Sequence, residues 1–248
     1  MINKMANLFV SLQIKGYYYR QRLRTPIDKV RLGKNVLLNK WTKFEGENRV
    51  GNNSVIHHSK IGFATYIGND CKLVHADIGK YTSIASNVGI VAGTHPISEF
   101  ISTSPVFYSV AFGGGYTYVD REYYKVYKYV DEEKNMLVKI GNDVWLGEGV
   151  KIIQGVSIGD GVIVAAYSVV TKNLDPYGVY AGCPARLVKR RYKDEMIEQL
   201  LKFEWWNQKT DWIKYHADSF RDKEKFMKLI EGEENGVAGK LDKNMGGV

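Results

Sequence analysis

Aliphatic residues recur every six positions in the second half of the chain, and a small residue often follows. The aliphatic positions are Ile140, Leu146, Ile152, Ile158, Val164 and Val170. The small residues after them are Gly141, Gly147, Gly159 and Ala165. A β-strand alternates with a period of two and a helix with a period near 3.6, so neither explains a period of six. Such a repeat indicates an architecture of stacked units.

The same pattern begins less regularly at Leu32-Gly33 and continues through the first half of the chain. Its further units are Val50-Gly51, Ile61-Gly62, Ile67-Gly68, Ile78-Gly79, Ile84-Ala85 and Ile90-Val91. Steps of five residues, from Ile56 to Ile61 and from Leu73 to Ile78, require only a turn that absorbs one residue. If each hexad is a short strand and a turn, three hexads form one coil of a triangular prism, with small residues at tight corners. The sequence therefore predicts an all-β solenoid over residues 32–186, whose coils bury a core only by stacking.

The repeat stops between His95 and Lys139. This segment contains Thr94-His95-Pro96, a triplet of glycines at 113–115 and a tyrosine-rich stretch from Tyr116 to Tyr129. Loops of this length rarely occur in a compact domain without a role. Loops held by a rigid scaffold often carry binding and catalytic residues. We expect an extruded loop over residues 95–139 to contact the substrate or a partner.

Helical patterns flank the repeat on both sides. Met5, Leu8, Phe9 and Leu12 recur at helical spacing ahead of a basic segment. We interpret residues 1–31 as an N-terminal helical cap over the open end of the solenoid. The alternative is a basic amphipathic helix that lies on an anionic membrane surface.

After the repeat, apolar stripes predict C-terminal helices over residues 187–230. One stripe ends at Trp205-Trp206, and a second helical stretch runs from Trp212 to Ile230. Residues 231–248 are rich in glycine and are predicted to form a flexible tail.

Composition and charge limit the class of protein. The chain has 248 residues and a formal charge of +8, concentrated before residue 35 and in a basic knot. This knot consists of Arg186, Lys189, Arg190, Arg191 and Lys193. Anionic partners are therefore plausible, although no aromatic-and-basic module for nucleic acid is present. Two distant cysteines exclude a disulfide framework. Without a long apolar run or a secretory cleavage pattern, we expect a cytoplasmic protein, peripheral to the membrane if the N-terminal helix binds it.

Two motifs add a family resemblance to the repeat. Gly141-Asn142-Asp143-Val144-Trp145-Leu146-Gly147 and Gly182-Cys183-Pro184-Ala185-Arg186 resemble the left-handed parallel β-helix acyltransferases. The most similar subgroup is the xenobiotic and polysaccharide O-acetyltransferases, related to the chloramphenicol and streptogramin acetyltransferases. The resemblance implies a left-handed solenoid and a homotrimer with active sites between subunits. It also implies that acetyl-coenzyme A binds between neighbouring prisms.

His95 is the candidate catalytic base. A sugar hydroxyl is a poor nucleophile until a base takes its proton, and a neutral imidazole suits that role near pH 7. An oxyanion donor is also needed, but the sequence does not identify it. Asn87 and Glu148 are candidates for orienting His95 or the acceptor, and His75 is a candidate acceptor contact.

The resemblance implies that coenzyme A runs along the coils of the second half. Small residues would allow the pantetheine to approach the backbone, and basic residues would pair with its phosphates. The implied contacts are Trp145, Gly147, Ala165, Ala166, Ser168, Thr171, Lys172 and Arg186.

Two other classes of protein share the predicted fold. The γ-type carbonic anhydrases bind zinc through three histidines, and the repeat places His58 and His75 at equivalent positions of adjacent coils. His95 falls outside that column, so a third ligand is missing unless another subunit supplies one, and no metal is expected. A non-catalytic scaffold would bind no coenzyme A.

The sequence thus favours an acetyl-coenzyme A-dependent O-acetyltransferase that acts directly, without a covalent enzyme intermediate. The expected acceptor is a hydroxyl of a saccharide such as a capsule or O-antigen precursor, which the sequence leaves open as free, nucleotide-linked or lipid-linked. Antibiotic acetylation is the alternative function.

Overall fold

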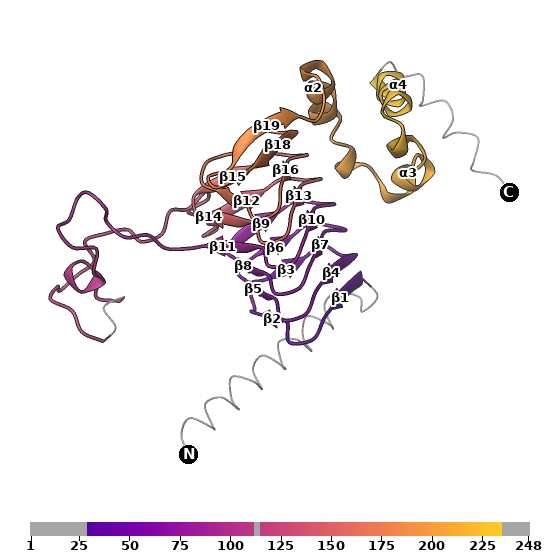
Figure 1. Cartoon of the computed structure of the whole chain (residues 1–248). Helices are drawn as coiled ribbons and strands as arrows, with labels where there is room; N and C mark the ends of the chain where they lie inside the picture. The colour runs from indigo at the N-terminus through magenta and orange to yellow at the C-terminus, as the bar shows by residue number, and fades with distance from the viewer. Residues whose placement is uncertain (1–28, 112–114, 235–248) are drawn as a thin grey trace. The chain divides into compact units, whose positions relative to one another are not determined.

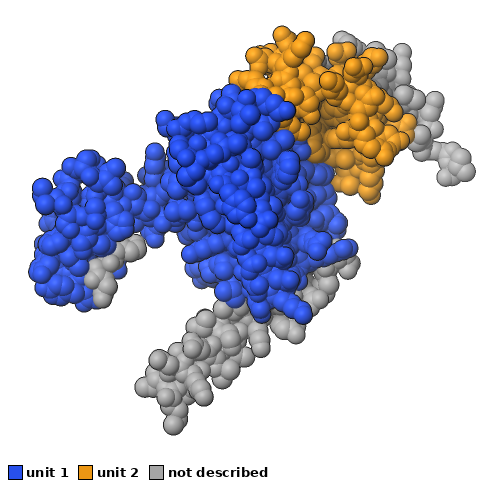
Figure 2. Space-filling model, viewed as in Figure 1, with its two compact units in different colours: residues 1–189 blue, residues 190–248 orange. Residues whose placement is uncertain are grey.

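The computed structural model describes residues 29–111 and 115–234. The chain divides into two compact units, residues 1–189 and residues 190–248, coloured blue and orange in Figure 2. The first unit contains the repeat and its loop, and the second contains the C-terminal helices.

Short parallel strands build the first unit as three sheets. The eight-stranded sheet has the order β1 (Val30–Leu32), β4 (Asn48–Val50), β7 (Tyr66–Ile67), β10 (Ser83–Ile84), β13 (Trp145–Leu146), β16 (Ile163–Val164), β18 (Gly178–Ala181) and β19 (Arg186–Arg190). The six-stranded sheet contains β2 (Leu37–Leu38), β5 (Val55–His57), β8 (Lys72–Val74), β11 (Gly89–Val91), β14 (Lys151–Ile153) and β17 (Val169–Val170). The five-stranded sheet contains β3 (Lys43–Phe44), β6 (Lys60–Ile61), β9 (Ala76–Ile78), β12 (Val138–Ile140) and β15 (Val156–Ile158).

Each sheet carries one column of inward-facing aliphatic residues. In the six-stranded sheet, Ile56 lies over Leu73, and Ile90 lies over Ile152 and then Val170. Equivalent columns run through Ile67, Ile84 and Leu146 and through Ile61, Ile78 and Ile140. All six predicted hexad positions from Ile140 to Val170 are buried. The predicted β-solenoid is confirmed, since three sheets receive successive hexads in turn (Figure 1).

The corners between strands explain the small residues that follow each aliphatic one. A Cβ atom on Gly62 would lie 2.4 Å from the carbonyl carbon of Gly79 on the next coil. On Gly147 it would lie 2.5 Å from the backbone nitrogen of Ala166. Since both contacts are with backbone, a larger side chain would force the coils apart. The spacing of the coils therefore dictates glycine at these two corners.

The loop occupies residues 92–137, slightly earlier than the predicted 95–139. It leaves after β11 and returns at β12, and a 3₁₀ turn, η2 (Pro105–Phe107), lies within it. Ile140 then pairs with Ile78, so the repeat resumes in register on the preceding coil.

The C-terminal unit contains α2 (Asp194–Phe203), α3 (Thr210–Tyr215) and α4 (Lys223–Glu234), with 3₁₀ turns η3 (Trp205–Asn207) and η4 (Ser219–Arg221). Its buried apolar side chains are Ile197, Leu200, Trp206, Phe226 and Ile230. Trp206 is therefore part of a small core, while Trp205 contacts Phe220 with ring centroids 4.9 Å apart.

Several predicted boundaries differ from the structure. Residues expected to begin the C-terminal helices form the end of β19, because the exposed backbone after Arg186 continues the eight-stranded sheet. The expected single helix from Trp212 to Ile230 is interrupted, since the Asp222 carboxylate accepts hydrogen bonds from the backbone N–H groups of Glu224 and Lys225. This arrangement starts a new helix.

The two predicted ends of the chain are only partly described. α4 continues to Glu234 and so includes the first residues assigned to the tail, while β1 begins within the predicted cap at Val30. The rest of the N-terminal cap, with its membrane alternative, and residues 235–248 of the tail lie outside the described residues. Across the described ranges, no helix combines the length and apolar character that a bilayer span requires.

Candidate active site

The side chain of Gln154 bonds both ends of the loop to the solenoid. We call the segment at Gly93, which follows β11, the outgoing leg and the segment at Val126, which leads to β12, the returning leg. The Gln154 side chain is 6% exposed. The Oε1 atom accepts a hydrogen bond from the backbone N–H of Gly93 at 2.8 Å. The Nε2 atom donates to the carbonyl oxygen of Val126 at 2.9 Å. The backbone N–H of Thr94 also donates to Val126, at 3.0 Å. One buried amide thus joins the outgoing and returning legs close to His95.

The His95 ring is oriented within the loop by Thr103 and Tyr108. Nδ1 of His95 lies 2.8 Å from the carbonyl oxygen of Thr103 and 2.8 Å from the hydroxyl oxygen of Tyr108. A carbonyl oxygen only accepts hydrogen bonds, so this contact places the proton of the neutral imidazole on Nδ1. The lone pair is then on Nε2, where a base must have it. The exposed His95 side chain can therefore present Nε2 to an acceptor.

An aromatic cluster holds this part of the loop together. Tyr108 is 1% exposed, and its ring makes edge contacts with Phe100 and Tyr124 at centroid distances of 6.0 and 5.4 Å. Burial raises the pKa of Tyr108, so its hydroxyl stays neutral beside His95. The hydroxyl of Tyr124 donates to the carbonyl oxygen of His95 at 3.1 Å. A small aromatic cluster within the loop therefore holds His95 in place.

Glu122 ties the returning leg to the outer part of the loop. One carboxylate oxygen accepts hydrogen bonds from the Ser109 hydroxyl and from the backbone N–H groups of Val110 and Ala111, at 2.9 to 3.1 Å. Three donors on one oxygen fix this turn of the loop.

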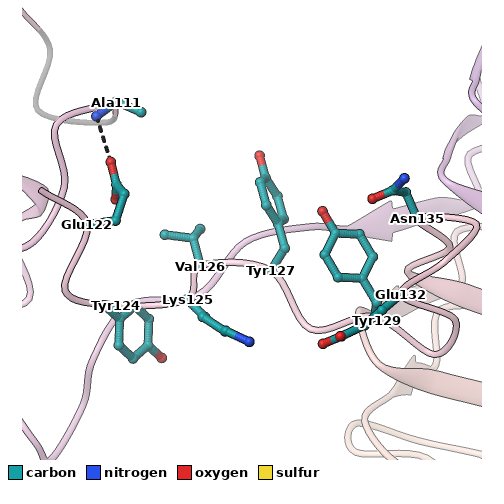
Figure 3. A pocket seen from close by; sticks show the side chains of 9 residues that line it. All are labelled: Ala111, Glu122, Tyr124, Lys125, Val126, Tyr127, Tyr129, Glu132 and Asn135. Atoms are coloured by element: carbon teal, nitrogen blue, oxygen red, sulfur yellow. Dashed lines mark hydrogen bonds between the residues drawn. The ribbon is translucent and has the colours of Figure 1, made fainter.

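A groove of about 540 Å³ follows the returning leg. Figure 3 shows the side chains of Tyr127 and Tyr129 next to each other, near Asn135, while Lys125 points to the other side of the ribbon. Tyr124, which bonds the backbone of His95, also lines the groove. Tyr124 therefore connects the groove to the backbone of the candidate base.

The structure separates the residues proposed for coenzyme A into two groups. Gly147, Ala165 and Ala166 lie at the corner between the eight-stranded and six-stranded sheets, after β13, which contains Trp145, and after β16. Thr171 and Lys172 follow β17 at the next corner, the one from which the loop departs after β11. Trp145 is 53% exposed, and Ala166, Thr171, Lys172 and Arg186 are also exposed.

Two members of the proposed set have roles within the coils. Ser168 is 1% exposed, and its hydroxyl accepts a hydrogen bond from the backbone N–H of Gly182 at 3.0 Å. Gly147 is required by the close approach of Ala166. Both residues are explained by coil stacking, so we leave their side chains out of the binding surface proposed below.

Asn87 and Glu148 contact each other rather than His95. The Asn87 amide donates to the Glu148 carboxylate at 3.3 Å across adjacent coils. They lie at the corner before β11 and β14, whereas the loop leaves after β11. The two residues therefore form a polar rung at the corner that carries Gly147.

His75 anchors the end of the loop. Its Nδ1 atom lies 2.8 Å from the carbonyl oxygen of Asn135, and its ring stacks on His58 with centroids 4.5 Å apart. Trp41 extends the stack at 5.6 Å. The predicted equivalence of His58 and His75 is confirmed. Over residues 29–111 and 115–234, however, no three His, Cys, Asp or Glu side chains gather as metal ligands would.

Comparisons with known proteins cover the repeat and its surroundings. A family model described as "Bacterial transferase hexapeptide (six repeats)" matches residues 137–172. A chloramphenicol acetyltransferase of Agrobacterium fabrum is 30% identical over 163 residues, which cover 63% of this chain and 71% of that protein. A "Probable macrolide acetyltransferase" of Lysinibacillus sphaericus is 57% identical over 68 residues, covering 27% of this chain and 38% of the relative.

Solved structures show a weaker similarity. The crystal structure of a hexapeptide-repeat acetyltransferase from Vibrio cholerae has 20% identity and a TM-score of 0.43, and covers 77% of this chain and 90% of that one. The matches to the macrolide enzyme and to a chloramphenicol acetyltransferase of Morganella morganii span only 38% and 36% of those relatives. The chain thus spans less than two fifths of the length of these two relatives.

Proposed function

Because the chain belongs to the hexapeptide-repeat acetyltransferases, we propose that it transfers an acetyl group from acetyl-coenzyme A to a hydroxyl of a saccharide. His95 is the base of this reaction. The observation that carries the proposal is the contact between Nδ1 of His95 and the carbonyl oxygen of Thr103, because it leaves the lone pair on Nε2.

The reaction needs one proton to move twice. The cosubstrate supplies the acetyl group as a thioester. Nε2 of His95 takes the proton of the acceptor hydroxyl while the oxygen forms a bond to the carbonyl carbon of the acetyl group. When the carbon–sulfur bond breaks, Nε2 returns this proton to the sulfur. The products are the acetate ester and the free thiol, and no group remains attached to the protein.

Exposed residues on β13, on β19 and at two corners of the solenoid form the proposed coenzyme A surface. Trp145 offers an exposed apolar side chain on β13, and Ala166 offers a small side chain at the corner that follows β16. Thr171 and Lys172 lie at the corner that carries the loop, and Lys172 and Arg186 supply positive charge for phosphate groups. We propose that the active site is completed in a homotrimer. Leu37 and Val91 support this assembly, because they are 38% and 42% exposed on the six-stranded sheet.

The acceptor is proposed to lie in the groove along the returning leg. Tyr127 is 39% exposed there, and its ring centroid is 6.2 Å from that of Tyr129. Aromatic faces pack well against the apolar face of a pyranose ring, while Glu132 and Asn135 supply polar groups for its hydroxyls. A capsule or O-antigen precursor, carried by a nucleotide or a lipid, has this chemistry.

Antibiotic acetylation is the second candidate function. It is favoured by the 57% identity to the macrolide acetyltransferase and by the chloramphenicol acetyltransferase of Agrobacterium fabrum. An apolar antibiotic would also use the tyrosines of the groove but would not need its carboxylates.

Labelled acetyl-coenzyme A and a panel of acceptors test both functions. The panel contains sugars, nucleotide sugars, chloramphenicol and a macrolide, each with the wild-type protein and the His95→Ala variant. We expect transfer to a saccharide that falls by at least about 100-fold in the variant. Tyr127→Ala should raise KM for the sugar, while the exposed Tyr116→Ala, outside the groove, serves as the matched control. Transfer that survives His95→Ala contradicts the mechanism, and transfer to antibiotics alone selects the second function.

A further inference from the structure

The C-terminal unit contains a second groove, of about 700 Å³, on α2 and α4. Four cationic side chains line it: Arg191, Lys193, Lys223 and Lys228. Two of them belong to the basic knot that follows the repeat in the sequence, and the other two come from α4. Residues separated by thirty positions or more thus bring positive charge to one surface.

The lysines of this groove are available to a ligand. Lys193, Lys223 and Lys228 are exposed. Among the described residues, none of the three forms an ion pair, although Glu224 and Glu231 also line the groove. The formal charge of the groove is positive, with four cations against two carboxylates. A bound anion would therefore find three lysine ammonium groups that form no ion pair among the described residues.

The groove also has an apolar part. Met196 of α2 and Met227 of α4 are partly exposed and line it. Tyr192 also lines the groove, and the guanidinium carbon of Arg191 lies 5.3 Å from the centroid of its ring. Methionine side chains adapt to irregular apolar ligands. Cations around two methionines suit a molecule that joins a phosphate to hydrocarbon, rather than a free anion.

We propose that this groove binds the acidic headgroup of a membrane phospholipid. The lysines contact the phosphate, and Met196 and Met227 contact the glycerol and upper acyl chains. This inference extends the proposed function, because it would hold the enzyme at a membrane that carries lipid-linked acceptors. It is independent of the N-terminal segment, and it does not require the catalytic proposal to be correct.

Vesicle flotation with the full chain tests the proposal. The vesicles are phosphatidylcholine, with or without phosphatidylglycerol. The groove variant is Lys193→Gln, Lys223→Gln and Lys228→Gln. The matched control is Lys209→Gln, Lys214→Gln and Lys225→Gln, which removes the same charge from exposed lysines of the same unit outside the groove. Circular dichroism melts of both variants confirm that the helices remain folded.

The expected result is binding of the wild type to the acidic vesicles and a loss of about 100-fold in the groove variant, with the control close to wild type. Met196→Gln with Met227→Gln should weaken binding while leaving the charge unchanged. Equal losses in both lysine variants, or no loss in either, overturn the proposal. Displacement by glycerol phosphate at millimolar concentration would also overturn it, because the ligand would then be a soluble phosphate. Acetyl transfer to soluble acceptors is measured on the same variants and should not change.

Discussion

Replacing Gln154 should release the loop without unfolding the solenoid. The Gln154→Leu variant keeps the size of the side chain but removes both hydrogen bonds to the legs, one from Gly93 and one to Val126. Each such bond contributes about 1 kcal/mol net, so the closed loop loses about 2 kcal/mol. That change corresponds to a roughly 30-fold increase in the population of the open loop.

Limited proteolysis with trypsin measures this opening. Arg121, Lys125 and Lys128 are exposed on the returning leg, and cleavage there requires the leg to detach locally. When opening is fast relative to cleavage, the cleavage rate follows the open population. We therefore expect loop cleavage in the variant to accelerate about 30-fold. The midpoint of thermal unfolding should change little, and kcat/KM for acetyl transfer should fall because His95 follows Gly93 by two residues.

Asn173→Leu provides the matched control for this experiment. Asn173 accepts one hydrogen bond from the backbone N–H of Ser157 at an exposed corner that follows β17. Its loss should leave loop cleavage unchanged. If Gln154→Leu is cleaved at the wild-type rate, the amide does not hold the loop and the reasoning fails. If loop cleavage accelerates equally in both variants, the cause is a general loosening of the coils and not the release of the loop.

Two further predictions concern stability. Ile152→Ala should lower the free energy of unfolding by about 2–5 kcal/mol, because Ile152 is fully buried between Ile90 and Val170. Urea titration measures this free energy. A loss below about 1 kcal/mol contradicts tight stacking of the coils. Burial opposes ionisation of Glu45, but its ion pair with Lys60 at 2.9 Å prevails and lowers the pKa. The pair therefore stabilises the fold above the unfolded pKa of Glu45 and is lost as pH falls through the folded value. Glu45→Gln should flatten the acid side of the stability profile, and an unchanged profile would contradict this assignment.

The repeat was predictable from the sequence because its chemistry is local and periodic. The aliphatic position of each hexad must face inward, and Gly62 or Gly147 must be small, whatever the rest of the chain does. The same period located the loop by its absence. It also placed His58 beside His75, which the stacked rings confirm.

The surroundings of His95 could not be predicted in this way. Thr103 and Tyr108 lie eight and thirteen residues away in a segment without a period, and their contacts depend on how the loop closes. Gln154 occupies an ordinary corner position, and nothing near it in the sequence indicates that it bonds Gly93 and Val126. Such roles arise from long-range contacts and become visible only in three dimensions.

Because the loop is inserted between β11 and β12, the ribosome synthesises the first coils well before the coils that cover them. Before the loop, the backbone N–H of Lys34 donates to the side chain of Asn52, 18 positions away, whereas the equivalent bond from Lys80 to Asn142 spans 62 positions. Closing the longer segment costs about 1 kcal/mol more in chain entropy. On a ribosome, the earlier coils can pair first, yet Ile78, Ile84 and Ile90 stay uncovered at their open end until Ile140, Leu146 and Ile152 emerge. During that interval the nascent chain exposes an unpaired strand edge lined by aliphatic side chains, which is the kind of surface that a chaperone binds.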